Sequence, residues 1–193
     1  MPFTAFHVVP VWFLWLRYSA KLDFVALTVG AVIPDLFEPI LILVLPSEYW
    51  TNRGWSHSLL GAVTYDAALA IIATFLVARP FLAWADRVAP SRLWTHFGDR
   101  EYRLRQPWTV TILSTVVGTL SHLLADLPFH PSSPIFFPGT IIEVFPAHLE
   151  WIAVTISNLL FGAAFAYLLY RYWRRRSREK PQAAPKGPGT EIP

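Results

Sequence analysis

Long apolar stretches constrain this chain most, because three of them match the length of a membrane-spanning helix: 58–78, 109–129 and 151–170. A helix crosses ~30 Å of hydrocarbon at ~1.5 Å per residue, so roughly 20 apolar residues are needed. Charged residues make up only 15% of the 193 residues, against about 25% in soluble domains. One small core cannot bury so much apolar surface. The sequence therefore predicts an integral membrane protein.

Two further apolar stretches are less regular. The stretch 22–45 is long enough to span, but it contains Pro34 and Asp35 near its middle. Proline removes a helical hydrogen bond and kinks or ends a helix, so we expect this span to be broken at Pro34-Asp35. The stretch 3–16 is short and is divided by Pro10; it forms either a fifth short span or a segment that enters part of the bilayer. The predicted fold is all-α, a polytopic membrane helix bundle of four to five spans.

The basic residues predict the orientation of the bundle. All 16 Lys and Arg residues except Arg53 lie on alternate connections, namely 17–21, 79–108 and the segment from 171 onward. The positive-inside rule places these segments in the cytoplasm and the 46–57 and 130–150 loops on the outer side. The expected location is the cytoplasmic membrane, with a cytoplasmic C-terminus.

We expect residues 1–178 to form one transmembrane helical domain. Residues 179–193 are rich in Pro and Gly and predict a disordered cytoplasmic tail. The stretch 3–16 does not have the pattern of a cleaved signal, since Arg17 and Lys21 follow its apolar run. Because the basic residues flank apolar segments, the expected partners are membrane lipids and not nucleic acid. The chain has no Cys, which excludes disulfides and thiolate metal sites.

Ionisable residues inside apolar stretches are costly in a membrane and are therefore the candidates for function. His122 and Asp126 lie four residues apart in the 109–129 stretch, so both project from the same helix face, one turn apart. This spacing lets both side chains bind one ion. It also suits a plain hydrogen bond in which Asp126 holds the imidazole, and the spacing alone leaves both readings open.

Other elements place similar side chains at a similar depth. Asp35 lies in the outer half of its stretch with Glu38 three residues on; the alternative role for Asp35 is to cap a second half-helix. His57 directly precedes the 58–78 stretch, beside Ser56 as a candidate helix N-cap, and would otherwise be an interfacial histidine. His7 lies in the first apolar segment, where a lone histidine commonly serves packing.

Taken together, these elements bring three histidines and two carboxylates to one level near the outer face: His7, Asp35, His57, His122 and Asp126. Imidazole and carboxylate are ligands of Zn²⁺ and related divalent ions, and structural zinc sites usually contain Cys. We therefore predict one or two divalent ions, with zinc the expected metal. Asp35 or Glu38 would orient or deprotonate a water there. His130 is a possible additional ligand or proton donor.

Four short blocks carry a resemblance to a known group. They are Met1-Pro2-Phe3-Thr4 with His7, the residues from Gly30 to Asp35, those from Trp55 to Gly61, and those from Ser121 to Asp126 followed by His130-Pro131. In this order, over residues 1–135, the chain resembles the membrane-bound metal-dependent hydrolases, which include the LexA-regulated inner-membrane hydrolases, and above all a branch that begins Met-Pro-Phe-Thr.

The resemblance implies a hydrolase with the same five metal positions. Several relatives in the wider group carry Pro-Asp-x-Asp, whereas this chain has Phe37 at the second Asp position. If the second Asp of these relatives binds an ion, we expect this chain either to hold fewer ions than they do or to use Glu38 in place of that Asp.

Three classes of function stay open on the sequence. One is a hydrolase that acts on a lipid or lipid-linked ester or phosphoester near the extracytoplasmic face. Another is a transporter or proton relay that uses Asp35, Glu38, His122 and Asp126, since carboxylates in a broken span are also a feature of transporters. The third is a non-catalytic membrane protein with a structural metal. A haem carrier fits poorly, because haem ligands need no carboxylate partners.

Three remaining polar residues are expected to lie apart from the site. Asp66 comes nine residues after His57, half a turn out of phase on a helix, so we expect it to face elsewhere and to pair with another helix. His148 lies in the proline-rich 130–150 segment, which is either an interfacial loop with surface histidines or a lid over the site. His96 is surrounded by arginines and is expected to be solvated.

Overall fold

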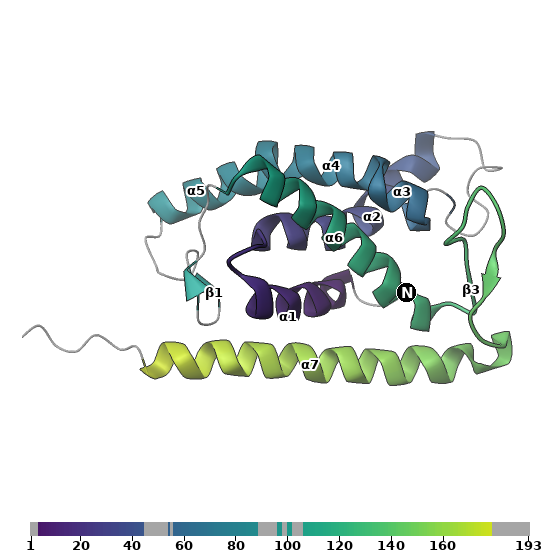
Figure 1. Cartoon of the computed structure of the whole chain (residues 1–193). Coiled ribbons are helices and arrows are strands. Elements are labelled where there is room, and N and C mark those ends of the chain that lie inside the picture. Colours follow the sequence, from purple (N-terminus) through teal and green to yellow (C-terminus); the bar gives the residue numbers. More distant parts are fainter. Residues whose placement is uncertain are drawn as a thin grey trace, which may run out of the picture.

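The structure is a computed structural model that describes residues 4–44, 54, 56–88, 96–97, 100–101 and 106–178. The described chain is predominantly helical (Figure 1). Its elements are η1 (Thr4–His7), α1 (Val8–Tyr18), α2 (Phe24–Val44), α3 (Leu59–Val63), α4 (Tyr65–Ala73), η4 (Thr74–Ala78), α5 (Arg79–Val88), β1 (His96–Phe97), β2 (Arg100–Glu101), α6 (Trp108–Asp126), η5 (Leu127–Phe129), β3 (Ser132–Ser133), β4 (Ile142–Glu143), η6 (Ala147–Leu149) and α7 (Glu150–Arg178).

Three helical segments are long and apolar enough to cross a membrane: Leu59–Ala85, Trp108–Phe129 and Ala147–Arg174. They contain the three predicted stretches apart from Ser58, which is an N-cap, and the helical character of these stretches is confirmed. The 11 residues of α1 extend only about 16 Å, so α1 is too short to cross. In Figure 1 the C-terminal ends of α5 and α7 lie with β1 at one end of the molecule, whereas the N-terminus and β3 lie at the other.

The predicted break at Pro34-Asp35 is wrong. Helix α2 runs without interruption from Phe24 to Val44 and contains both Pro34 and Pro39. A proline deletes the hydrogen bond of its own missing N–H, while the neighbouring bonds of the ladder persist. Packing of α2 along α6 and α4 stabilises the rest of the helix. Asp35 therefore projects from a helical turn and not from an open helix end.

The charge of Arg79 predicts a position in the 79–108 loop. The structure instead places Arg79 in a helix. The π-helical turn η4 leads directly into α5, so the helix that starts at Leu59 continues past Arg79. Inside the bundle, Arg79 forms an ion pair with the fully buried Asp23, with 2.6 Å between Nη2 and Oδ2. Pairing lowers the cost of burying the guanidinium, and this is why an arginine is tolerated within the helix.

The central packing of the bundle is the contact between α2 and α6, which cross at two glycines. A Cβ built on Gly30 would lie 2.6 Å from the carbonyl oxygen of Thr115, and one built on Gly118 would clash with the carbonyl oxygen of Leu27. Small residues let membrane helices approach closely. This close approach brings the C-terminal half of α6 against the middle of α2, where the candidate ligands lie.

The 130–150 segment folds over the start of α3. Strands β3 and β4 form a short antiparallel ladder, and the backbone N–H of Leu59 donates to the carbonyl of Ile135 at 2.9 Å. Ile135 is buried with Ala62 and Leu123. The segment thus covers one side of the candidate site. The 46–53 part of the other outer loop and the tail 179–193 lie outside the described residues.

Candidate metal centre

Three ligand atoms, from α2, from the segment just before α3 and from α6, form a nearly equilateral triangle. The Nε2 atoms of His57 and His122 are 3.4 Å apart, and Oδ1 of Asp35 lies 3.7 Å from His57 Nε2 and 3.6 Å from His122 Nε2. The centre of this triangle lies about 2.1 Å from each atom, which matches the Zn–N and Zn–O bond lengths of ~2.0–2.2 Å. The arrangement therefore suits one ion held jointly by all three residues.

The second oxygen of Asp35 faces the first segment of the chain. Oδ2 of Asp35 lies 3.6 Å from Nε2 of His7. The His7 ring lies beside the His122 ring, with 4.1 Å between their centroids, and His7 is fully buried. Ligand atoms of His7, Asp35 and His122 all fall within 4.8 Å of one another. The carboxylate of Asp35 thus lies between two groups of ligands, as a bridging carboxylate would.

Asp126 extends the cluster toward the loop side. Its Oδ2 lies 3.8 Å from Nε2 of His57, and its Oδ1 lies 3.5 Å from Nε2 of His130. Glu38 is also near, since ligand atoms of Asp35, Glu38 and His57 fall within 4.8 Å of one another. The structure therefore brings together all seven residues that the sequence singled out, including Glu38 and the additional candidate His130.

Hydrogen bonds on the far side of two imidazoles set the direction of their Nε2 atoms. His122 Nδ1–H donates to the backbone carbonyl of Ala31 at 2.8 Å, and His57 Nδ1 pairs with Ser56 Oγ at 3.0 Å. Because a carbonyl can only accept, Nδ1 of His122 carries the proton and its Nε2 presents a lone pair in the neutral ring. Metal-binding histidines are held by this kind of outer hydrogen bond.

Local structure explains how each histidine reaches the site. Ser58 and not Ser56 is the N-cap of α3, since Ser58 Oγ accepts from the N–H of Gly61 at 3.0 Å. The predicted capping role of Ser56 is wrong, and its hydroxyl orients His57 instead. His7 is the last residue of η1, immediately before α1. His122 reaches Ala31 because the glycine contact lets α6 lie directly on α2.

The cluster is almost closed to its surroundings. His7, His57 and His122 are at most 1% exposed, and Asp126 and Glu38 are buried as well. The side chains of Asp35 and His130 are the more accessible ones, at 11% and 23%.

A second polar cluster escaped the sequence analysis. Arg79 Nη2 donates to Asp23 Oδ2 at 2.6 Å and to Thr111 Oγ1 at 2.7 Å, and the backbone N–H of Asp23 donates to Ser114 Oγ at 2.8 Å. Asp23 also caps α2, because its Oδ1 accepts from the N–H groups of Val25 and Ala26. An Asp directly before an apolar run is a helix-start signal that could have identified this residue.

The predicted partner of Asp66 is not found. Asp66 is fully buried on α4, and neither carboxylate oxygen has a hydrogen-bond partner among the described residues. It is not part of either potential ligand group. His148 is exposed on η6, and of His96 only the backbone, in β1, is described.

The match to a family covers the whole candidate site. The family described as Domain of unknown function (DUF4184) matches residues 1–137. The chain belongs to this family. The matched region contains every residue of the cluster and ends before α7. No curated protein and no solved structure matches the chain.

Proposed function

We propose that this protein is a membrane-embedded metal-dependent hydrolase whose metal is held by His7, Asp35, His57, His122 and Asp126. The triangle of His57, His122 and Asp35 atoms carries the proposal, because its 3.4–3.7 Å edges are within about 0.1 Å of the 3.3–3.6 Å expected between two ligands of one tetrahedral zinc ion. The resemblance of the sequence to the metal-dependent hydrolase group supports the same proposal.

The membrane arrangement that we infer has four spans. Helix α2 contains 21 residues and extends about 31 Å, enough to accompany the three longer segments across the bilayer. Helix α1 adds a half-length element that ends at Tyr18, close to the start of α2. With the basic ends of α5 and α7 in the cytoplasm, the cluster opens toward the extracytoplasmic face.

The cluster residues have distinct roles in this proposal. A divalent ion would supply a Lewis acid and would lower the pKa of a bound water to near 7. Asp35, placed between two ligand groups, positions the ligand set. Glu38 lies next to it and accepts the proton of the attacking water. Ser56 and the Ala31 carbonyl hold the imidazoles, and the 130–150 segment keeps bulk water from the site.

Asp66 favours a second candidate function, a proton relay. A fully buried carboxyl group without a hydrogen-bond partner is costly inside a membrane protein and by default suggests a role. Asp66 lies on α4. Along the chain, α3 separates α4 from His57 and η4 separates it from Arg79. In this candidate function Asp66 exchanges a proton between the two sides, and the histidine cluster serves as its outer station.

Elemental analysis of the detergent-purified protein tests the metal site. We expect one or two equivalents of zinc per chain in the wild type, and near-complete loss in the double variant His122→Ala/Asp126→Ala. The exposed His148 outside the cluster supplies the control, and His148→Ala should retain full metal content. Equal, sub-stoichiometric metal in all three proteins would disprove the site.

A second measurement separates hydrolysis from a structural or transport role. The metal-loaded protein should cleave a chromogenic phosphoester or ester, and Glu38→Gln should lower turnover while it keeps the metal. Full metal content without turnover of either substrate class would reject the hydrolase and favour the relay. Proton uptake by proteoliposomes that depends on Asp66 would then identify the alternative.

A further inference from the structure

Helix α7 contributes no residue to the histidine cluster, yet it packs against the segments that carry two of its histidines. Besides the adjoining η6, its main contacts are with η1, which ends at His7, with η5, which ends just before His130, and with α1. Only 11% of the apolar part of the span that contains α7 is buried, against 50% for the span that contains α6. Helix α7 therefore meets the rest of the bundle through few residues, and these lie against η1, η5 and α1.

In both segments a phenylalanine directly precedes the histidine and packs on α7. The ring centroid of Phe6 lies 6.3 Å from that of Phe165. Phe129, which is 1% exposed, lies 5.7 Å from Phe161, again between ring centroids. Aromatic pairs attract each other at these separations. Phe161 and Phe165 are four residues apart on α7, so they project from one face of the helix, one turn apart. One face of α7 thus contacts both segments.

The 3₁₀ turn η1 explains how Phe6 and His7 face opposite neighbours. Three residues complete a turn, so successive side chains diverge by about 120°. The ring of His7 lies against that of His122, with 4.1 Å between centroids, while Phe6 lies against Phe165. A Cβ built on Gly162 of α7 would lie 3.6 Å from Cζ of Phe6. The hydrogen bonds of a 3₁₀ helix have poorer geometry than those of an α-helix, so packing on both sides orients this turn.

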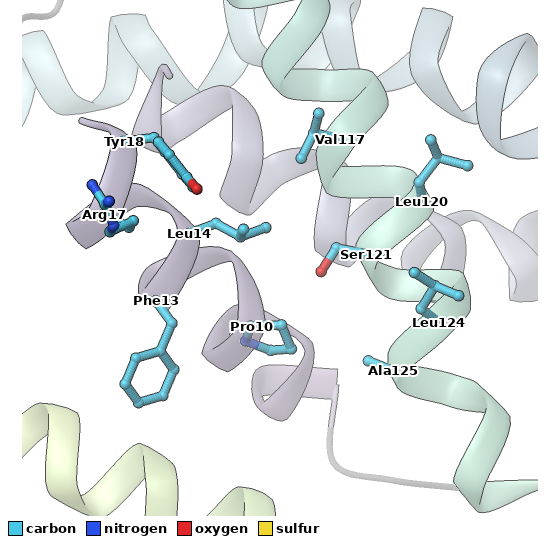
Figure 2. A pocket seen from close by; sticks show the side chains of 10 residues that line it. All are labelled: Pro10, Phe13, Leu14, Arg17, Tyr18, Val117, Leu120, Ser121, Leu124 and Ala125. Atoms are coloured by element: carbon cyan, nitrogen blue, oxygen red, sulfur yellow. The ribbon is translucent and has the colours of Figure 1, made fainter. Parts of the chain in front are cut away.

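Helix α1, which continues from η1, has only partial support from α6. An apolar groove of about 680 Å³ lies between the two helices (Figure 2). Leu14 lines it on α1, and Val117 and Leu120 line it on α6. On another side α1 packs against α7, whose Leu168 is 2% exposed and belongs to the same apolar core as Trp12. The position of η1 therefore depends on α7, whereas α2, α3 and α6 do not have α7 among their main contacts.

We propose that α7 positions His7 and His130 at the candidate metal centre, through Phe165 and Phe161 respectively. The inference rests on the proposed function, because it assigns a positioning task at that same site. The ligands on α2, on α6 and just before α3 form one part of the centre, which the core of the bundle holds. His7 and His130 form a second part, and their distance from the other ligands is set by the packing of α7.

Chemical modification of the histidines in the metal-free, detergent-purified full chain tests this arrangement. Diethyl pyrocarbonate reacts with accessible imidazoles, and mass spectrometry assigns the modification to each histidine. His57 and His122 are at most 1% exposed and should stay protected in the wild type and in every variant of α7. The exposed His148 should react in all of them, which shows that the reagent is active.

Each variant of the aromatic pair should affect one histidine. Phe165→Ala removes the ring that packs on η1, so modification of His7 should rise several-fold. Phe161→Ala should do the same for His130. Phe165→Leu keeps most of the apolar volume and should restore most of the protection of His7. Leu160→Ala alters a residue of α7 that is 65% exposed and should leave both histidines as they are in the wild type.

Zinc affinity connects this positioning to the metal. It should fall about tenfold in Phe165→Ala, the lower end of the effect of residues that surround metal ligands, and recover in Phe165→Leu. If Phe165→Ala does not fold, Gly162→Leu replaces it, because the larger side chain pushes on Phe6 and should expose His7. Unchanged zinc affinity, continued protection of His7, or equal exposure of all buried histidines would overturn the positioning role. Selective exposure of His7 in a protein whose wild type binds no zinc would overturn the proposed function alone.

Discussion

The two buried polar clusters of this bundle differ in the distances between their atoms. Around Asp23, Arg79 and Thr111, donors and acceptors approach to 2.6–3.1 Å, the range of good hydrogen bonds. In the histidine cluster the corresponding separations are 3.4–3.8 Å. The first cluster is held by direct hydrogen bonds between its own side chains. The second has the spacing of atoms that surround a common ion.

The two clusters also differ in what they do for the structure. The Asp23 cluster connects three helices: the start of α2, the start of α5 and the first half of α6. Its hydrogen bonds therefore hold the fold together. The histidine cluster instead keeps two Nε2 atoms facing each other at 3.4 Å. With the Nδ1 proton of His122 engaged by Ala31, this contact is weak without a positive ion between the rings. In the proposed function, an ion between these atoms would stabilise the histidine cluster.

The largest expected effect is that of breaking the Asp23 cluster. Arg79→Ala leaves the fully buried Asp23 carboxylate without its cation, which costs about 3–5 kcal/mol for a buried pair. Thermal unfolding in detergent should show a large loss of stability. Zinc content of the protein that remains folded should stay at the wild-type level. The double variant Asp23→Leu/Arg79→Met should regain much of the stability, and no recovery would show that the ion pair is not the cause.

The next effect comes from the metal itself. Zinc at 100 times its dissociation constant should stabilise the wild type by about 2.7 kcal/mol, because it binds the folded state alone. The midpoint of thermal unfolding should rise accordingly and should return after chelation. His57→Ala should remove this response, whereas Arg79→Ala should retain it. An equal zinc response in His57→Ala would indicate binding elsewhere.

Much of the architecture could be predicted because apolar length decides it. The stretches 109–129 and 151–170 lie within helices that the structure contains. The break at Pro34 was wrong, because packing against neighbouring helices outweighs one missing hydrogen bond. The position of Arg79 was wrong for a similar reason, since its partner Asp23 lies 56 residues away and pairing at that range has no local sequence pattern.

The residues of the candidate site could be predicted where an ionisable side chain stands in an apolar stretch of the sequence. His122, Asp126 and Asp35 are ionisable residues in apolar surroundings, and their cost in a membrane makes each one conspicuous. The outer contacts were not predictable. The carbonyl of Ala31 is present in every peptide, and only the close crossing at Gly30 and Gly118 makes that carbonyl the partner of His122.

The hydroxyl of Ser56 provides a smaller and more selective test of the cluster. Ser56→Ala removes the hydrogen bond to His57 Nδ1 and frees the ring to rotate. Such outer contacts are worth about 10–100-fold in metal affinity. Calorimetric titration with zinc should show this loss, with little change in the stability of the metal-free protein. Ser58→Ala is the matched control, because it removes the N-cap of α3 and should lower stability by about 1 kcal/mol. A Ser56→Ala protein with wild-type affinity would mean that His57 is held by packing alone.

The smallest effect, and the one of opposite sign, is expected at Asp66. Its two carboxylate oxygens have no hydrogen-bond partner in the described part of the chain, so its burial opposes folding. Replacing an unsatisfied buried polar group with an apolar one removes a penalty of about 1–2 kcal/mol. Asp66→Leu should therefore raise the midpoint of unfolding, while Asp66→Asn, which keeps a polar group, should change it less. Zinc affinity and hydrolysis should be unaltered in both. If Asp66→Leu is stabilised but loses activity, the carboxyl group is kept for proton transfer, and both polar clusters would then belong to one path through the membrane.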